Sequence, residues 1–461
     1  MRASLVNSKL LLLFCFIASS IVSASEYSLS QTVNLRAYFA DNFTLSTINE
    51  DERYGGTGSL NLDLSKATET SELNGGIFLA INNYNIKSYN TSDQRGNFDY
   101  TKKTESGSWG FGGVYDRDSI SEFEKADQNL GQQDRISSQV LSQSLRANWN
   151  QQINEKNLFA LSASATDVAY ESVFRNDYRY GQSSLLWQHF LTDRIRLQAN
   201  IAYSLFDSDS TNSLSVSPLF DDAIAAGDLS ENDAIFLIEA CRSGFNLIDQ
   251  VNGGALTPWR CFEELERDNL QSTVKLQVGI YYVWTDYVTL DLLYGESSVK
   301  TELEQSYIDL PSLDGSEGPR IKSEIGKDDG GVYQASISYS GERFQSSFNA
   351  SRNESVNSNS VLSLNTNVGL DVRLRVNEYH SINGGVAWYR QENSGFSGAE
   401  FFDKDIATFT LIYQYNVSEN WTLRSTYKFK DLDQAQQLLH ASGNEVSFNV
   451  RWNPAKYRWS R

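Results

Sequence analysis

The strongest constraint on this chain is an alternation of apolar and polar residues that recurs along most of its length. One of the clearest stretches places Ile195, Leu197 and Ala199 at every second position, continued by Ile201, Tyr203 and Leu205. Most of the residues between them are polar. Successive side chains of a β-strand point to opposite faces, so a period of two predicts strands with one apolar and one polar face.

The connections between these stretches favour a membrane barrel over a soluble sandwich, which would alternate in the same way. Short links that contain Thr, Asn or Ser beside acidic residues recur at 153–156, 191–194, 284–287, 340–342, 376–378 and 417–420. The connections that follow them are longer, polar and acidic. Short turns at one end, long loops at the other and an outward apolar face are typical of outer-membrane barrels. Only a closed barrel carries strands through lipid with every backbone polar group paired.

Counting strands with strict up-and-down alternation predicts eighteen. Segment 95–104 rests on Phe98 and Tyr100, and a count without it and one neighbour would give sixteen. An even number leaves both termini on the periplasmic side, as bacterial barrels require. The predicted segments are 27–40, 54–66, 72–87, 95–104, 107–121, 137–151, 157–170, 180–190, 195–207, 268–284, 287–301, 329–340, 343–353, 359–376, 379–391, 403–417, 421–431 and 443–452.

Composition excludes several other classes of protein. The chain has 39 Lys and Arg against 58 Asp and Glu, a formal charge of −19, so it repels the phosphates of nucleic acids. Beyond residue 24 no apolar run approaches the length of a membrane helix. With three His and three Cys, and no catalytic or metal-ligand spacing among them, we expect no enzyme activity, no metal and no cofactor.

The first 24 residues read as a secretory signal peptide. Arg2 and Lys9 precede the apolar run 10–17, and residues 22–24 (Val-Ser-Ala) offer a cleavage site before Ser25. An uncleaved anchor helix is the alternative, although the apolar run is short for one. Residues 25–461 then form the barrel, and we expect them in the outer membrane of a Gram-negative bacterium.

One connection, at 208–267, is far longer than a hairpin loop. It carries Cys241 and Cys261, and two cysteines in one loop of an exported chain predict a disulfide. Ser230 to Gly244 reads as a short capped helix. Two interpretations stay open: a loop folded into or over the barrel mouth as a constriction, or an extracellular decoration tied by the disulfide.

Strand parity separates the charges of the lumen from those of the loops. Four acidic residues are predicted to face the lumen: Asp63, Asp99, Asp291 and Asp371. Nine basic residues are predicted to face it: Arg36, Arg146, Arg196, Lys275, Arg373, Arg375, Arg424, Lys428 and Arg451. A basic lumen favours anionic solutes, and arginine suits carboxylates and phosphates. The alternative is that these cations pair with lumen or loop carboxylates and only fill the barrel.

The chain resembles the outer-membrane barrel proteins associated with exopolysaccharide and PEP-CTERM gene clusters. The resemblance rests on the signal peptide, the turns at 191–194 and 284–287, residues 114–119 (VYDRDS) and the ending 448–454 (FNVRWNP). The final strand is aromatic like an assembly signal of outer-membrane proteins, but a tail follows it, in which Tyr457 or Trp459 could serve instead. The resemblance implies polysaccharide export, and alginate-type export channels are similar barrels with an arginine-rich lumen.

Two hypotheses about function follow. The first is a channel that exports or admits an anionic polysaccharide or small anionic solutes. The second is a surface scaffold or adhesin, in which the barrel is only an anchor. The partners expected in either case are outer-membrane lipid, lipopolysaccharide and the barrel-assembly machinery. Export would add the polysaccharide and periplasmic export components.

Overall fold

The computed structural model describes residues 25–42, 45, 52–87, 90–119, 139–171, 177–216, 261–310, 320–356, 362–393, 404–434 and 439–460. All regular structure in these residues is β-strand, apart from one residue of 3-10 type at Lys87. The strands are β1 (Glu26–Ala40), β2 (Arg53–Ala67), β3 (Ser71–Tyr84), β4 (Thr91–Thr104), β5 (Gly107–Ser119), β6 (Gln139–Asn154), β7 (Asn157–Tyr170), β8 (Asp177–Phe190), β9 (Ile195–Val216), β10 (Cys261–Thr285), β11 (Val288–Leu310), β12 (Arg320–Ser340), β13 (Phe344–Val356), β14 (Leu362–Arg375), β15 (His380–Asn393), β16 (Lys404–Asn416), β17 (Trp421–Gln434), β18 (Leu439–Trp452) and β19 (Tyr457–Ser460).

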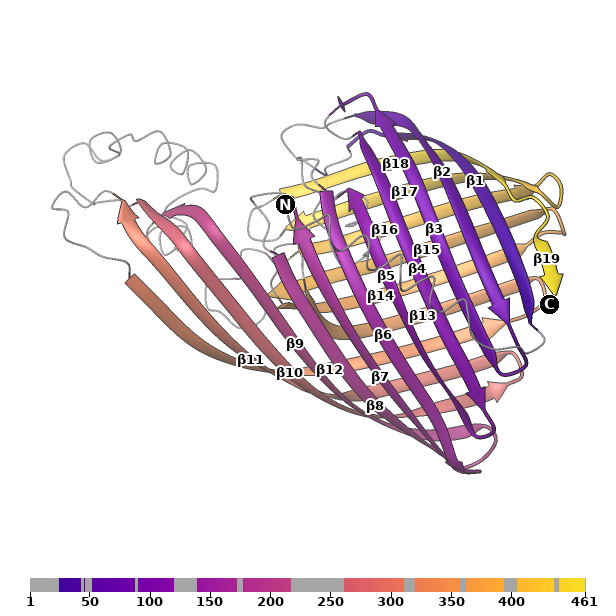
Figure 1. The fold of residues 1–461 in the computed structure, drawn as a ribbon, viewed down its shortest axis with the longest axis horizontal. Coiled ribbons are helices and arrows are strands. Elements are labelled where there is room, and N and C mark those ends of the chain that lie inside the picture. Colours follow the sequence, from indigo (N-terminus) through magenta and orange to yellow (C-terminus); the bar gives the residue numbers. More distant parts are fainter. Residues whose placement is uncertain are drawn as a thin grey trace.

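Strands β1 to β18 form a closed antiparallel barrel, which confirms the predicted fold class and strand number. Each strand pairs with the next along the chain, and β1 pairs with both β2 and β18, so the sheet has no beginning or end. Segment 95–104, the least supported in the sequence, lies within β4. The strands run obliquely around a wide barrel (Figure 1).

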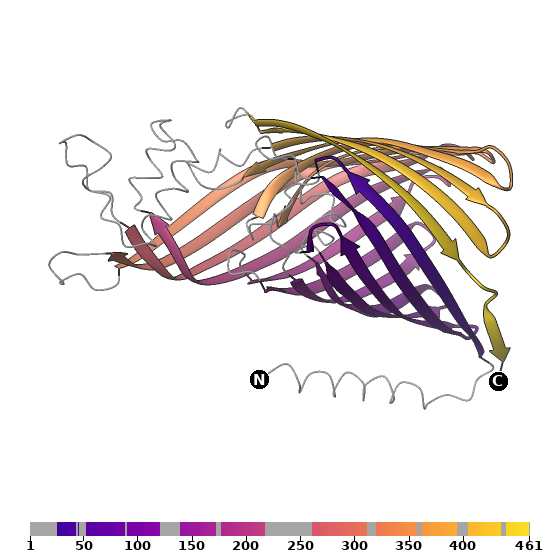
Figure 2. The same cartoon turned by 90° about the horizontal axis from the view of Figure 1, so that it is seen from above.

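The C-terminal tail completes the seam between the first and last strands. After Trp452 the chain leaves the ladder briefly and returns as β19, which pairs with residues 26–29 of β1. The Thr32 hydroxyl donates to Asn453 Oδ1 across the break at 2.7 Å, and the Trp459 ring stacks on Tyr27 with centroids 5.5 Å apart. β19 and the start of β1 therefore lie together at the short-turn end (Figure 2). Trp459, one of the two aromatic residues of the tail, contributes to barrel closure.

The short turns fold because a side-chain oxygen replaces a backbone acceptor. The Thr192 hydroxyl accepts from the backbone N–H groups of Arg194 (3.2 Å) and Ile195 (3.1 Å). In their own hairpins, Thr285 and Asn377 likewise accept from two backbone N–H groups, those of the first residue of the next strand and of the residue before it. Such Asx and ST turns fix the register of the hairpin. The Thr, Asn and Ser residues of the predicted links are thus structural.

The two faces of the barrel wall differ as the alternation predicts. Large apolar side chains are exposed on the outer face, among them Ile81 (69% exposed) and Val278 (67%). Trp284, Tyr287 and Trp421 mark the outer face near the short turns, as in an interfacial aromatic belt. The outer face is therefore apolar where lipid would contact it. Among the described residues no helix is long and apolar enough to span a membrane.

Four neighbouring strands, β9 to β12, are much longer than the rest and project beyond the barrel rim (Figure 1). Their extra residues pair with one another, with Val216 opposite Cys261 and Cys261 opposite Leu310. The predicted loop at 208–267 therefore begins and ends as strand. Residues 328–331 (Asp-Asp-Gly-Gly) have the composition of a turn before the predicted strand, yet they lie inside β12 opposite β11. Pairing between distant segments has overridden the local turn signal of these residues.

Two predictions, the signal peptide and the helix at 230–244, lie outside the described residues, and so does Cys241, one partner of the predicted disulfide. Cys261 is described in backbone only, as the first residue of β10. The disulfide between the two cysteines stays a prediction.

The ladder of backbone pairs between β12 and β13 ends at the pair Tyr333 and Arg352, and beyond this pair the two strands separate. β12 continues beside β11 alone, whereas the end of β13 lies against the inner face of the long strands. There Lys275 Nζ on β10 donates to Asn353 Oδ1 at 3.5 Å, three strands away in the sheet. Val332 on β12 is fully buried. The barrel thus narrows at its extracellular end, and β9 to β12 stand outside the narrowed rim.

We expect Thr192→Ala combined with Thr285→Ala to lower the free energy of unfolding by about 1–3 kcal/mol, because each loses an acceptor shared by two backbone N–H groups. Urea unfolding in phospholipid vesicles measures the change. The matched control is Thr426→Ala, which lies within β17 rather than in a turn. An equal loss in the control would contradict the structural role of the turn hydroxyls.

Candidate functional site

The inner wall formed by β14 to β18 and β1 collects most of the predicted lumen cations. Pairing register places Arg375 opposite Ser381, Ser381 opposite Gln414 and Gln414 opposite Arg424. The same row continues from Arg424 to Asn449 and from Asn449 to Arg36. We call this row of residues from Arg375 to Arg36 the basic row. It crosses six strands, and it brings together three arginines that lie far apart in the sequence.

Further cations lie one step above and one step below the basic row. Arg373 is opposite Asn383 on the extracellular side, and Arg451 is opposite Thr422 on the periplasmic side. Lys428 lies opposite Glu445, four residues beyond Arg424 on the same face. Six of the nine predicted lumen cations are therefore on one wall: Arg36, Arg373, Arg375, Arg424, Lys428 and Arg451.

Most of the arginines on this wall have no carboxylate partner. Arg36 forms an ion pair with Glu445, Nη2 to Oε1 at 2.8 Å. Arg373, Arg375, Arg424 and Arg451 are all exposed. Within the described part of the chain, none of their guanidinium groups forms an ion pair or a side-chain hydrogen bond. Arg36 and Arg451 are close enough to Arg424 to repel its charge. The wall thus presents uncompensated positive charge.

The other three predicted cations, on the remaining walls, all have partners. Arg146 donates to Asp99 Oδ1 from Nη2 (2.6 Å) and Nε (3.1 Å). Arg196 lies between two rings, 4.6 Å from the centroid of Phe190 and 4.9 Å from that of Tyr281. Lys275 donates to Asn353, as described above. For these three cations the alternative reading, pairing and packing within the barrel, describes the structure better than an anion site.

Several further charged residues lie on the inner face beside those that strand parity predicts. Arg95 pairs with Asp116 (Nη2 to Oδ2, 2.5 Å), and its position within 95–104 could have identified it. Arg53 is 1% exposed, and its guanidinium carbon lies 3.6 Å from the Tyr84 ring centroid. It precedes the predicted strand 54–66 by one residue, so alternation within that strand did not assign it a face. Glu445, the partner of Arg36, was within a predicted strand. These further inner charges all have partners: Arg95 pairs with Asp116, Glu445 pairs with Arg36, and Arg53 packs on Tyr84.

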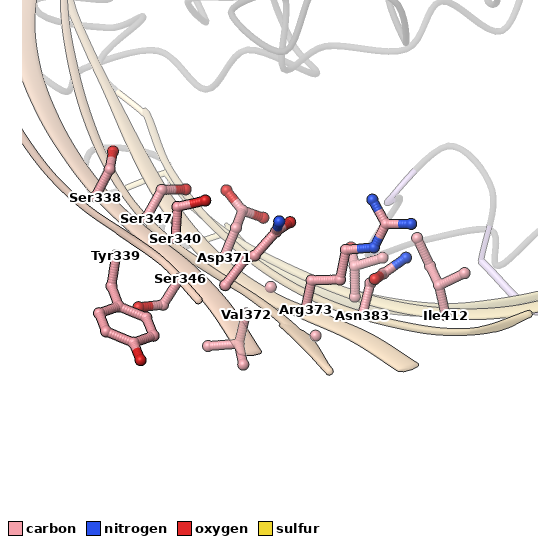
Figure 3. A pocket seen from close by; sticks show the side chains of 14 residues that line it. Ser338, Tyr339, Ser340, Ser346, Ser347, Asp371, Val372, Arg373, Asn383 and Ile412 are labelled. Atoms are coloured by element: carbon pink, nitrogen blue, oxygen red, sulfur yellow. The ribbon is translucent and has the colours of Figure 1, made fainter. Parts of the chain in front are cut away.

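A recess in the same wall lies beside the basic row, with a volume of about 420 Å³. β12 to β16 line it with hydroxyl, amide and charged side chains (Figure 3). Ser338, Ser347 and Arg373 project to one side of the ribbon, and Tyr339 and Val372 project to the other. The recess therefore opens on the polar face of the barrel wall.

The three histidines do not gather at this wall. His189 Nδ1 is 3.0 Å from Asn157 Oδ1, His380 Nδ1 is 2.7 Å from the Tyr413 hydroxyl, and His440 Nε2 is 3.2 Å from Asp431 Oδ1. Among the described residues, no group of three or more His, Cys, Asp or Glu is placed to hold a metal ion.

No family model matches the chain, and no curated protein matches it. Solved structures with a similar fold include the ferric yersiniabactin uptake receptor FyuA from Yersinia pestis (8% identity, 95% of this chain and 81% of that chain, TM-score 0.45). OccAB3 from Acinetobacter baumannii (8%, 94% and 99%, TM-score 0.40) and a Pseudomonas aeruginosa FadL homologue (10%, 94% and 90%, TM-score 0.36) are similar too. At these identities the likeness concerns the fold alone, so function is argued from the residues of this chain.

The unpaired state of the arginines predicts their chemical reactivity. We expect phenylglyoxal to modify Arg373, Arg375, Arg424 and Arg451 before Arg36, Arg196 and Arg53, because the second group is paired, packed on rings or buried. Peptide mass spectrometry of the reconstituted protein over a time course measures the order. Modification of Arg196 or Arg53 ahead of the first group would contradict the described wall.

Proposed function

We propose that the protein is an outer-membrane channel for anions and that the basic row is its selectivity element. The observation that carries this proposal is a group of exposed arginines on one wall that have no partner among the described residues: Arg373, Arg375, Arg424 and Arg451. Fixed charges of one sign along a low-dielectric wall raise the local concentration of counter-ions. The permeating solute would therefore carry carboxylate or phosphate groups, which the guanidinium fork binds well.

The spacing along the row supports a polyvalent anion, such as an acidic polysaccharide, as one substrate. Neighbouring strands are about 4.8 Å apart, so the backbone positions of Arg424 and Arg36 are separated by about 10 Å, and those of Arg375 and Arg424 by about 14 Å. A chain with repeated anionic groups could contact two or more of them at once, which strengthens weak contacts. Export of exopolysaccharide, implied by the sequence resemblance, belongs to this proposal, as do small anionic solutes.

A surface scaffold or adhesin is the second candidate, and the projecting strands β9 to β12 favour it. They offer a sheet beyond the barrel rim, which transport does not require. The two candidates differ in conductance: a barrel that serves only as an anchor needs no open lumen. In either case we expect outer-membrane lipid, lipopolysaccharide and the barrel-assembly machinery as partners.

The channel proposal predicts the effect of Arg373→Ser combined with Arg424→Ser. In planar bilayers with a KCl gradient, we expect the reversal potential of the native protein to have the sign of a pore that is more permeable to chloride than to potassium. The double variant should shift this reversal potential towards that of a non-selective pore, because the substitutions remove two positive charges from the wall.

The control is Arg179→Ser, since Arg179 pairs with Asp167 outside the basic row, at 3.3 Å. We expect the reversal potential of this variant to stay at the native value. A cation-selective or non-conducting native protein would contradict the channel proposal and favour the scaffold.

A further inference from the structure

The recess between β12 and β16 carries two opposite charges that do not neutralise each other. Asp371 and Arg373 lie two residues apart on β14, on the same face, with Cα atoms about 7 Å apart. No ion pair joins them, and no side-chain hydrogen bond of the described residues engages either charged group. In Figure 3 the Arg373 side chain extends along the recess away from Asp371, and the Asp371 carboxylate rises from the sheet. A ligand placed between them could meet both.

A glycine in the floor of the recess leaves space for the carboxylate of Asp371. Gly385 lies directly opposite Asp371 on β15, and a Cβ atom there would come within 2.8 Å of Asp371 Oδ1. Gly385 therefore leaves room above the inner face of the sheet, where a larger residue would displace the carboxylate.

The remaining lining supplies neutral hydrogen-bonding groups and one apolar surface. Gln345 and Asn383 offer amides, and Ser338, Ser347 and Thr410 offer hydroxyl groups. Ile412 borders the recess beside them. A volume of about 420 Å³ is at the small end of the range for ligand sites, which typically combine apolar surface with a few placed polar groups.

We propose that this recess is a binding subsite for one sugar ring that bears a carboxylate. Arg373 binds the carboxylate, and Asp371 accepts hydrogen bonds from ring hydroxyls. The amides and hydroxyls of Gln345, Asn383 and the serines complete the recognition of the ring, and Ile412 contacts its C–H groups. This inference rests on the proposed function, and it narrows the anionic solute to a sugar acid. Because the recess is open to the lumen, binding is weak enough for the solute to leave, as conduction requires.

Saturation-transfer difference NMR of the full chain in detergent micelles tests the subsite without depending on conduction. The probes are D-glucuronate, D-glucose and acetate, which carry both groups, the hydroxyls alone and the carboxylate alone. We expect glucuronate to bind most tightly. A signal for acetate equal to that for glucuronate would overturn the subsite, because it would show binding by charge alone, and so would the absence of any glucuronate signal.

The variants separate the two charged groups. Arg373→Gln should raise the Kd for glucuronate about tenfold and leave glucose unchanged, because a charge-assisted hydrogen bond is lost. Asp371→Asn should weaken both sugars, and Gly385→Ala should do the same by displacing the carboxylate. The matched control is Asp291→Asn on β11, outside the recess, whose carboxylate accepts a hydrogen bond from Gln198 at 3.2 Å. An equal effect of this control would overturn the proposal.

Failure of the subsite and failure of the channel are distinguishable in these data. An anion-selective conductance without glucuronate binding would overturn the subsite only. Glucuronate binding that responds to Arg373→Gln and Asp371→Asn, in a protein with no conductance, would support the subsite and overturn the channel.

Discussion

The whole structure depends on one constraint: inside a membrane every backbone N–H and C=O group must find its partner within the protein. An antiparallel sheet meets this demand only when its first and last strands pair, and here β1 pairs with β18 and, near the short turns, with β19. The Thr32–Asn453 hydrogen bond and the stacking of Trp459 on Tyr27 hold the seam where the ladder is interrupted. Closure in turn forces each strand to present one face to lipid and the other to the lumen.

This division of faces gives the net charge a different meaning. The net charge of −19 makes the chain acidic, yet one inner wall carries four arginines that have no partner within the described residues. Most other inner cations are balanced locally, as Arg146 is by Asp99 and Arg36 by Glu445. The electrostatic character of the lumen is therefore uneven around its circumference, and the basic row is its positive side.

Local pattern was sufficient to predict the eighteen strands and the Thr, Asn and Ser residues of the short turns, since both depend on neighbours within a few residues. Pairing across strands was not predictable. Asp99 and Arg146 meet because register places both opposite Gly112, where a Cβ atom would lie 2.3 Å from Asp99 Oδ1. Likewise, the turn signal of 328–331 yields to the ladder with β11. The recess also depends on five strands in register, which no single segment reveals.

Cysteine scanning along β17 tests the central claim, that alternate residues of each strand face lumen and lipid, most directly. In a chain carrying Cys241→Ser and Cys261→Ser, single cysteines replace residues 423 to 428 in turn. We expect a membrane-impermeant maleimide to label positions 424, 426 and 428, and a lipid-soluble maleimide to label positions 423, 425 and 427. The opposite phase, or labelling without alternation, would place Arg424 outside the lumen and contradict the account.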